Sequence, residues 1–116
     1  MQIVVEGHSE HIVVVQLRGE LDALTCGRVV DDVKTLAGTG PRHVVLNLCG
    51  LQFVDSTGLS AIARLSQALA EGGRNLVLSS PSAFCRSVME KLGLDRIVPI
   101  LDSDEEAGAV LTGVGP

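Results

Sequence analysis

The sequence predicts a single α/β domain whose small, mostly parallel sheet has four to five strands. The chain has 116 residues, which suits one compact domain with its own core. From about residue 19 onward, β-branched runs alternate with helix-like segments, a pattern typical of parallel strands joined by crossover helices. Glycines close the helix-like segments, as expected at helix C-termini.

An N-terminal hairpin opens the predicted sheet. Residues 2–6 and 11–18 are rich in β-branched side chains and flank a short polar turn. Gly19 is expected to end the second strand. A helix follows over about residues 23–36, where apolar residues recur at helical spacing, and the segment 38–41 is expected to stop it.

The centre of the chain predicts a buried strand and then a helix. Residues 43–48 are almost continuously apolar, which favours a central strand covered on both faces. After a short connection, residues 51–54 lead into the polar segment 55–58. A helix then runs to about Ala70 and ends at the glycine pair 72–73.

The last third of the chain continues the alternation. Residues 75–78 are the next predicted strand, and a helix begins near Ser82 and reaches Lys91. Residues 97–100 form a short extended piece, in which Pro99 indicates a sheet edge.

A final helix with an acidic first turn reaches about residue 112. Ser103 and Glu106 have the spacing of a capping box, and the acids complement the helix dipole, so this run needs no metal to explain it. The domain is therefore expected to span residues 1–112, and residues 113–116 to form a flexible C-terminal tail.

Composition excludes several classes of function. The net charge is −5 and Lys and Arg do not cluster, which disfavours a nucleic-acid partner. The chain has no signal-peptide pattern and its apolar runs are too short to span a membrane, so a cytoplasmic protein is expected. Cys26, Cys49 and Cys85 lack paired or zinc-binding spacing and are interpreted as small buried apolar residues, with a redox role left open. No cofactor or metal is expected.

The segment 53–59 holds the residues best able to carry a function. Asp55, Ser56 and Thr57 stand where a strand ends and a helix begins, and each is a good helix cap. In the structural interpretation, Asp55 or Ser56 caps the helix and Gly58 permits close packing. In the functional interpretation, free N–H groups at the helix start accommodate a phosphate on Ser56. That phosphate adds a charge of about −1.5 to −2, which would repel an acidic partner without unfolding the domain.

Enzymatic interpretations are weaker. The residues around Ser56 lack the GxSxG arrangement of a nucleophile elbow, and the sequence places none of the three histidines as its base. The glycine pairs lack the spacing of a phosphate-binding loop. By local chemistry alone, Asp22 is interpreted as a turn residue that caps the following helix. The chain is therefore not expected to be an enzyme.

Two elements together resemble the STAS domain of bacterial anti-sigma factor antagonists: residues 19–22 (GELD) and residues 54–59 (VDSTGL). The similarity covers about residues 10–112 and includes residues 43–48, 72–73, 92–94 and Ile97. It implies a small sheet with about four helices packed mainly on one face, in agreement with the predicted order of elements.

The resemblance implies a switch in which this chain is the substrate. Members of the family bind an anti-sigma factor that is also a serine kinase, and the unphosphorylated form thereby releases a sigma factor. The kinase ends binding by phosphorylating the serine after the motif aspartate, which is Ser56 here, and a serine phosphatase reverses the mark. The family pattern places Asp55, Thr57 and Gly58 beside the modified residue and Asp22 on the partner-facing surface.

One alternative lies within the same family. The chain would then be a STAS adaptor subunit of a transport ATPase or of a stressosome-like assembly, and Ser56 would only cap a helix. In either case a monomer is expected.

Overall fold

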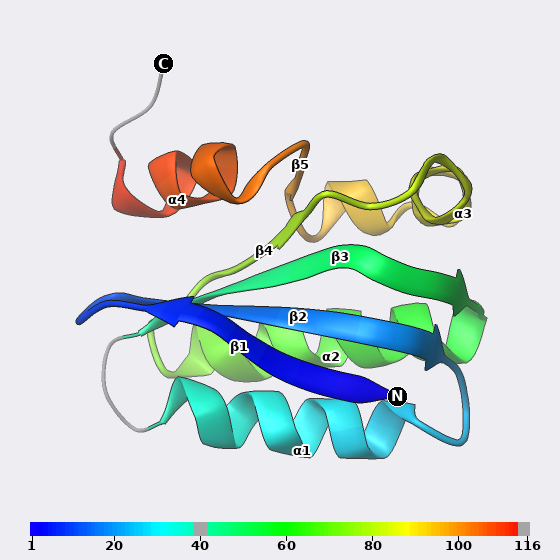
Figure 1. Ribbon diagram of the computed structural model, residues 1–116, viewed down its shortest axis with the longest axis horizontal. Coiled ribbons are helices and arrows are strands. Elements are labelled where there is room, and N and C mark those ends of the chain that lie inside the picture. Colours follow the sequence, from blue (N-terminus) through cyan, green and yellow to red (C-terminus); the bar gives the residue numbers. More distant parts are fainter. Residues whose placement is uncertain (39–41, 114–116) are drawn as a thin grey trace.

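The chain folds into a five-stranded mixed sheet with helices on both of its faces (Figure 1). This computed structural model describes residues 1–38 and 42–113. The strands lie side by side in sequence order; β1 is antiparallel to β2, and the other neighbouring pairs are parallel. The predicted α/β class, the mostly parallel sheet and the N-terminal hairpin are confirmed.

The strands are β1 (Gln2–His8), β2 (Ile12–Leu21), β3 (His43–Val54), β4 (Leu76–Ser79) and β5 (Ile100–Leu101). The helices are α1 (Cys26–Ala37), α2 (Ser56–Glu71), α3 (Ala83–Lys91) and α4 (Asp104–Thr112), with a single 3-10 turn, η1 (Leu94–Arg96), before β5. The predicted order of elements therefore matches the observed one, apart from η1.

The two central strands are longer than predicted. β2 does not end at Gly19, because this glycine adopts a φ of 117° at an irregularity in the register with β3 and the strand continues to Leu21. β3 likewise continues to Val54, since its second half stays paired with β2. Both strands consequently end at the same place, with Leu21 beside Val54.

The extended piece predicted over residues 97–100 is shorter than expected. The N–H groups of Ile97 and Val98 donate to the carbonyl of Leu94, which folds this stretch into the end of η1. Only Ile100 and Leu101 pair with β4, at the edge of the sheet that Pro99 indicated.

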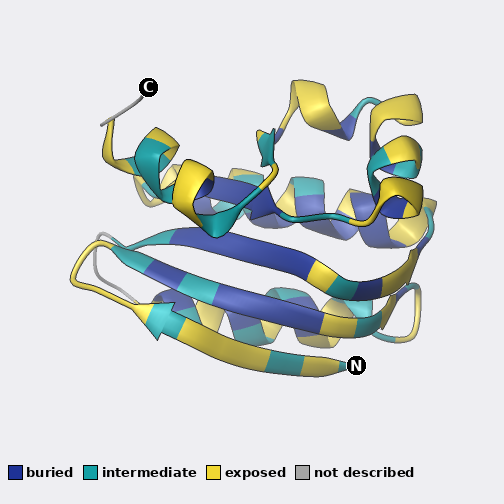
Figure 2. Ribbon diagram, turned by 45° about the horizontal axis from the view of Figure 1, so that its top comes forward, coloured by how far each residue is buried: buried dark blue, intermediate teal, exposed yellow. Residues whose placement is uncertain are grey.

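The core lies mainly on one face of the sheet. Leu17 of β2 and Leu46 of β3 belong to a large cluster that α1, α2 and α3 complete. Successive strand residues point to opposite faces, so Val45 and Val77 face the other way and pack with Ala107 of α4. Figure 2 shows that the middle of β2 and β3 is buried, whereas β1 is mostly exposed.

Hydrogen bonds at its first turn attach α4 to the sheet. The Ser103 hydroxyl accepts a hydrogen bond from the N–H of Glu106 (3.1 Å). The Glu106 carboxylate in turn accepts one from the N–H of the residue that precedes Ser103 (3.2 Å). The arrangement is close to the predicted capping box, in which that second donor would be Ser103 itself. The Asp104 carboxylate accepts from the Asn47 side-chain amide (2.9 Å) and from the Ser79 hydroxyl (2.5 Å). These bonds fix the start of α4 over β3 and β4.

The cysteines differ in burial. Cys85 is buried as predicted and Cys26 is half-buried, but Cys49 is exposed, which corrects the expectation of a buried residue. Cys49 lies two residues after Asn47, the β3 residue that is hydrogen-bonded to the start of α4, and its Sγ accepts from the side-chain amide of Gln16. None of the described helices has the length and apolar character of a bilayer-spanning segment. Within the predicted helix stop, residues 39–41 lie outside the described residues, as do residues 114–116 of the predicted tail.

Candidate functional site

The two sequence motifs meet at the carboxyl edge of the parallel strands. Leu21 and Val54 are neighbours in the β2–β3 register, so Asp22 and Asp55 follow adjacent strand ends. The N–H of Asp55 donates to the carbonyl of Leu21 (3.3 Å), which joins the two segments directly.

Asp55 is the cap of α2. Its backbone is extended, and its carboxylate accepts a hydrogen bond from the N–H of Gly58 (2.8 Å). Ser56 and Thr57 occupy the first turn and are exposed. Within residues 1–38 and 42–113, the Ser56 hydroxyl has no hydrogen-bond partner. The choice left open by the sequence is thus resolved: Asp55 caps the helix and Ser56 presents a free hydroxyl.

Gly58 permits the helix to approach β2. A Cβ at this position would lie 2.5 Å from the carbonyl oxygen of Leu21 and 2.9 Å from its Cγ. Only glycine fits without displacing the backbone that links the two motifs. Gly58 itself is buried, and its close contact with Leu21 fixes the position of its exposed neighbours Ser56 and Thr57.

Asp22 holds a turn rather than capping α1. Its carboxylate accepts from the N–H groups of Leu24 (3.0 Å) and Thr25 (3.2 Å), and α1 begins only at Cys26, with Thr25 as its cap residue. This corrects the interpretation of Asp22 as a helix cap. Leu24, within this turn, is 93% exposed.

A hollow of about 270 Å³ adjoins Ser56. It lies between α2 and the end of α3 with η1, and it is lined by Ser56, Leu59, Ser60, Ala63, Leu92, Leu94 and Ile97. The side chains of Leu92 and Ile97 are 59% and 60% exposed. Sequence reasoning assigned these two residues no role at the site, because their position beside Ser56 results from tertiary packing.

Further large apolar side chains are exposed near the same edge of the sheet. Phe53 lies one residue before the end of β3, and Phe84 lies in the first turn of α3, which follows β4. Of the large exposed apolar residues, Leu92 and Ile97 share the hollow with Ser56.

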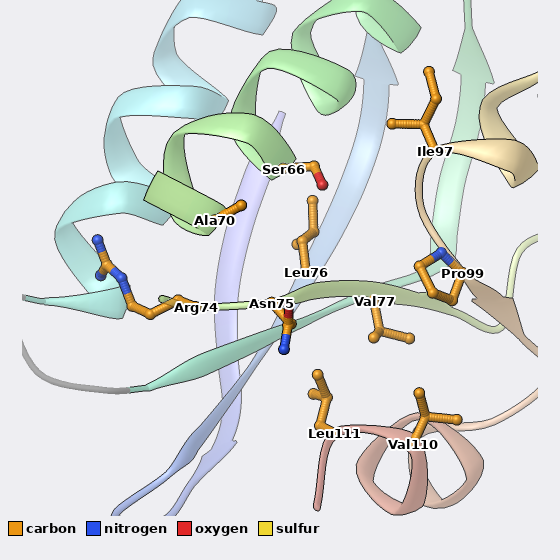
Figure 3. A pocket seen from close by; sticks show the side chains of 10 residues that line it. All are labelled: Ser66, Ala70, Arg74, Asn75, Leu76, Val77, Ile97, Pro99, Val110 and Leu111. Atoms are coloured by element: carbon orange, nitrogen blue, oxygen red, sulfur yellow. The ribbon is translucent and has the colours of Figure 1, made fainter. Parts of the chain in front are cut away.

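A second hollow of about 160 Å³ lies between the end of α2, the start of β4 and α4 (Figure 3). In this view Leu76 points toward α2 and Val77 toward α4. Ile97 lines both hollows, but none of the functional-site residues predicted from the sequence lines the second hollow.

Comparisons with known proteins agree on the family. A model of the STAS domain matches residues 2–107. The anti-sigma F factor antagonist of Paenibacillus polymyxa is 30% identical over 108 residues, which is 92% of each chain. The structure of the unphosphorylated anti-sigma factor antagonist SpoIIAA is similar over 99% of this chain and 100% of that one, with 26% identity and a TM-score of 0.73.

The fold also occurs within a larger protein. This chain is similar to a segment of the murine Solute Carrier 26 family member A9 anion transporter, with 18% identity and a TM-score of 0.80, covering 92% of this chain and 18% of the transporter. That likeness concerns the fold alone. The family-model match over nearly the whole chain and the conserved architecture show that this chain belongs to the STAS domain family.

Proposed function

We propose that this chain is a cytoplasmic anti-sigma factor antagonist that a partner kinase controls through Ser56. The unphosphorylated form binds an anti-sigma factor that is also a serine kinase, and so releases a sigma factor. Phosphorylation of Ser56 ends this binding, and a serine phosphatase restores it. The observation that carries the proposal is the exposed hydroxyl of Ser56 at the start of α2, which has no partner among residues 1–38 and 42–113 and lies beside a hollow lined mostly by apolar residues.

The start of α2 suits a phosphate. Asp55 already caps the helix through Gly58, so modification of Ser56 removes no cap. The N–H groups of Ser56 and Thr57 have no partner within the described part of the chain, and they lie at the positive end of the helix dipole. A phosphate here is therefore compatible with the folded domain.

The chain is the acceptor in this reaction, and the kinase supplies the catalytic groups. The Ser56 Oγ attacks the γ-phosphorus of ATP, an O–P bond forms, ADP leaves, and the hydroxyl proton passes to a base of the kinase. Asp55 and Thr57 border the acceptor, and Asp22 holds the adjoining turn on the partner-facing side.

Intact-mass spectrometry tests the proposal. The purified chain is incubated with ATP and each anti-sigma factor kinase of its own cell, beside Ser56→Ala and Thr57→Ala. We expect a single phosphate on the wild type and on Thr57→Ala, and none on Ser56→Ala. Absence of phosphate with every kinase would contradict the proposal, and transfer to Ser56→Ala would move the site to another hydroxyl.

The alternative role is an adaptor subunit of a transport ATPase or of a stressosome-like assembly. A similar fold also occurs as a segment of a larger anion transporter, so the fold by itself does not distinguish the two roles. Co-purification with an ATPase that is not a serine kinase, unchanged in Ser56→Asp, would support it.

A further inference from the structure

We infer that the hollow beside Ser56 receives an apolar side chain of the anti-sigma factor, and that a phosphate on Ser56 ends binding because it prevents this side chain from occupying the hollow. The inference rests on the proposed function and adds how the switch acts. Two features carry it: the composition of the hollow and the position of Ser56 in its wall.

The lining of the hollow is suited to bind an apolar side chain. Apart from Ser56 and Ser60, its lining consists of Leu59, Ala63, Leu92, Leu94 and Ile97, and no charged side chain lines it. Leu92 and Ile97, which line the hollow, are each more than half exposed. An occupant therefore gains by burying apolar atoms, and an ionic group of a partner would find no counter-charge within it.

The hollow is continuous with the surface that the kinase must cover. Ser56 is both the proposed phosphate acceptor and one of the residues that line the hollow. A kinase that brings ATP to this hydroxyl also covers the adjoining turn of α2 and the facing η1. The occupant of the hollow is therefore the anti-sigma factor itself rather than a separate partner.

The position of Ser56 predicts a local mechanism for the switch. A phosphate of charge about −2 at the wall of an uncharged hollow has no cation in the lining to pair with, so covering it with an apolar side chain leaves a buried, unpaired charge. Long-range repulsion between exposed charges would instead weaken as salt screens it. The two mechanisms therefore differ in their response to neutral substitution and to salt.

The first test compares substitutions of Ser56 by calorimetric titration with the anti-sigma factor. We expect Ser56→Asn to bind about tenfold more weakly than Ser56→Ala although both are neutral, and Ser56→Asp to bind more weakly still. The ratio between the alanine and aspartate variants should not change from about 0.1 M to about 1 M salt. Equal affinities of Ser56→Asn and Ser56→Ala together with recovery of Ser56→Asp at high salt would overturn the inference.

The second test changes the other wall of the hollow. Leu92→Ser and Ile97→Ser alter exposed residues, and each should weaken binding by about tenfold or more while phosphorylation of Ser56 remains detectable. Val5→Ser is the matched control, because Val5 is an exposed valine of β1, which takes no part in the hollow. Equal affinities of all three variants would contradict the inference and leave the phosphorylation proposal intact.

A third test needs no partner protein, so it tests the inference even if no kinase binds the chain. Isopropanol is titrated as a small apolar probe into the ¹⁵N-labelled full chain. We expect saturable shifts at the amides of Ser60, Ala63 and Ile97 in the wild type and in Ser56→Ala, and markedly smaller shifts in Ser56→Asp. Shifts that are absent from these amides, or equal in all three proteins, would overturn the inference whatever the outcome with the kinase.

Discussion

Asp55 and Ser56 have different roles at the start of α2, although the sequence allows either residue to cap the helix. Both are good helix caps, and the pattern of a strand followed by a helix fits either choice. The extended backbone of Asp55 and its 2.8 Å bond to Gly58 decide the matter. Ser56 is thereby left exposed, and its hydroxyl has no partner in the described part of the chain, as the proposed modification requires.

These different roles predict that substitutions of Asp55 and of Ser56 affect stability differently. Asp55→Ala should lower the free energy of unfolding by about 1 kcal/mol, because the N–H of Gly58 loses its partner. Ser56→Ala should change it by less than about 0.5 kcal/mol, as expected for an exposed residue. Urea denaturation measures both, and Asp55→Asn, which keeps a capping oxygen, is the control. Equal losses for the two alanine variants would show that Ser56 shares the cap.

Gly58 predicts a larger effect from a single methyl group. In Gly58→Ala the new Cβ collides with the backbone of Leu21, so the free energy of unfolding should fall by about 1–3 kcal/mol. Gly27→Ala is the matched control. Gly27 lies in α1, a Cβ there would meet no side chain and no neighbouring element within 4 Å, and the variant should gain up to about 1 kcal/mol. A neutral Gly58→Ala in urea denaturation would mean that the two motif segments are not packed as described.

Ser56→Asp tests whether the start of α2 tolerates negative charge. The carboxylate lies at the positive end of the helix dipole, so stability should be unchanged or rise by about 0.3–1 kcal/mol. Thermal unfolding followed by circular dichroism measures this effect. A marked fall in the melting temperature would contradict the claim that the switch leaves the fold intact.

At the scale of elements, the position of α4 on the sheet depends on the carboxylate of Asp104. α4 spans nine residues and covers the face opposite the main core, where few apolar side chains hold it. Asp104 joins its first turn to Asn47 of β3 and to Ser79 of β4, a residue with no exposed surface. This anchor, more than the apolar contact, sets where α4 begins.

Asp104→Ala should therefore loosen α4 while the rest of the sheet stays formed. The buried Ser79 hydroxyl and the Asn47 amide lose their acceptor, which should cost about 1–3 kcal/mol. Hydrogen exchange of the α4 amides should accelerate in this variant. Glu105→Ala is the control, because Glu105 is exposed in the same first turn and loses only its interaction with the dipole. Equal acceleration in both variants would assign the effect to the dipole.

The elements that could be predicted are those with a local signal. Alternation of β-branched and helical patterns located all five strands and four helices, and the capping residues before α2, α3 and α4 fixed their starts. Two errors have local causes: the N–H groups of Ile97 and Val98 donate back to Leu94, and Asp22 holds a turn before α1. A third error arose where tertiary pairing outweighed a local stop. Gly19 looked like a strand end, yet β2 continues because β3 pairs with it as far as Leu21.

At the scale of the whole molecule, the motif positions could be predicted but the surface around them could not. Parallel strands end at one edge of the sheet, so residues 19–22 and 54–59 had to meet there. Leu92 and Ile97 reach Ser56 only because η1 folds against α2, a contact between distant parts of the chain that no local pattern reports. The exposure of Leu24 likewise depends on the turn that Asp22 holds.

The measurement that tests the central claim most directly is the affinity of one anti-sigma factor kinase for two forms of the chain. The kinase is titrated with the unmodified protein and with protein phosphorylated at Ser56, in the presence of ADP to prevent further transfer. The account predicts that the phosphorylated form binds at least about tenfold more weakly, a difference of about 1.4 kcal/mol or more. Equal dissociation constants for two folded forms would contradict it, because Ser56 would then carry a mark that does not control binding.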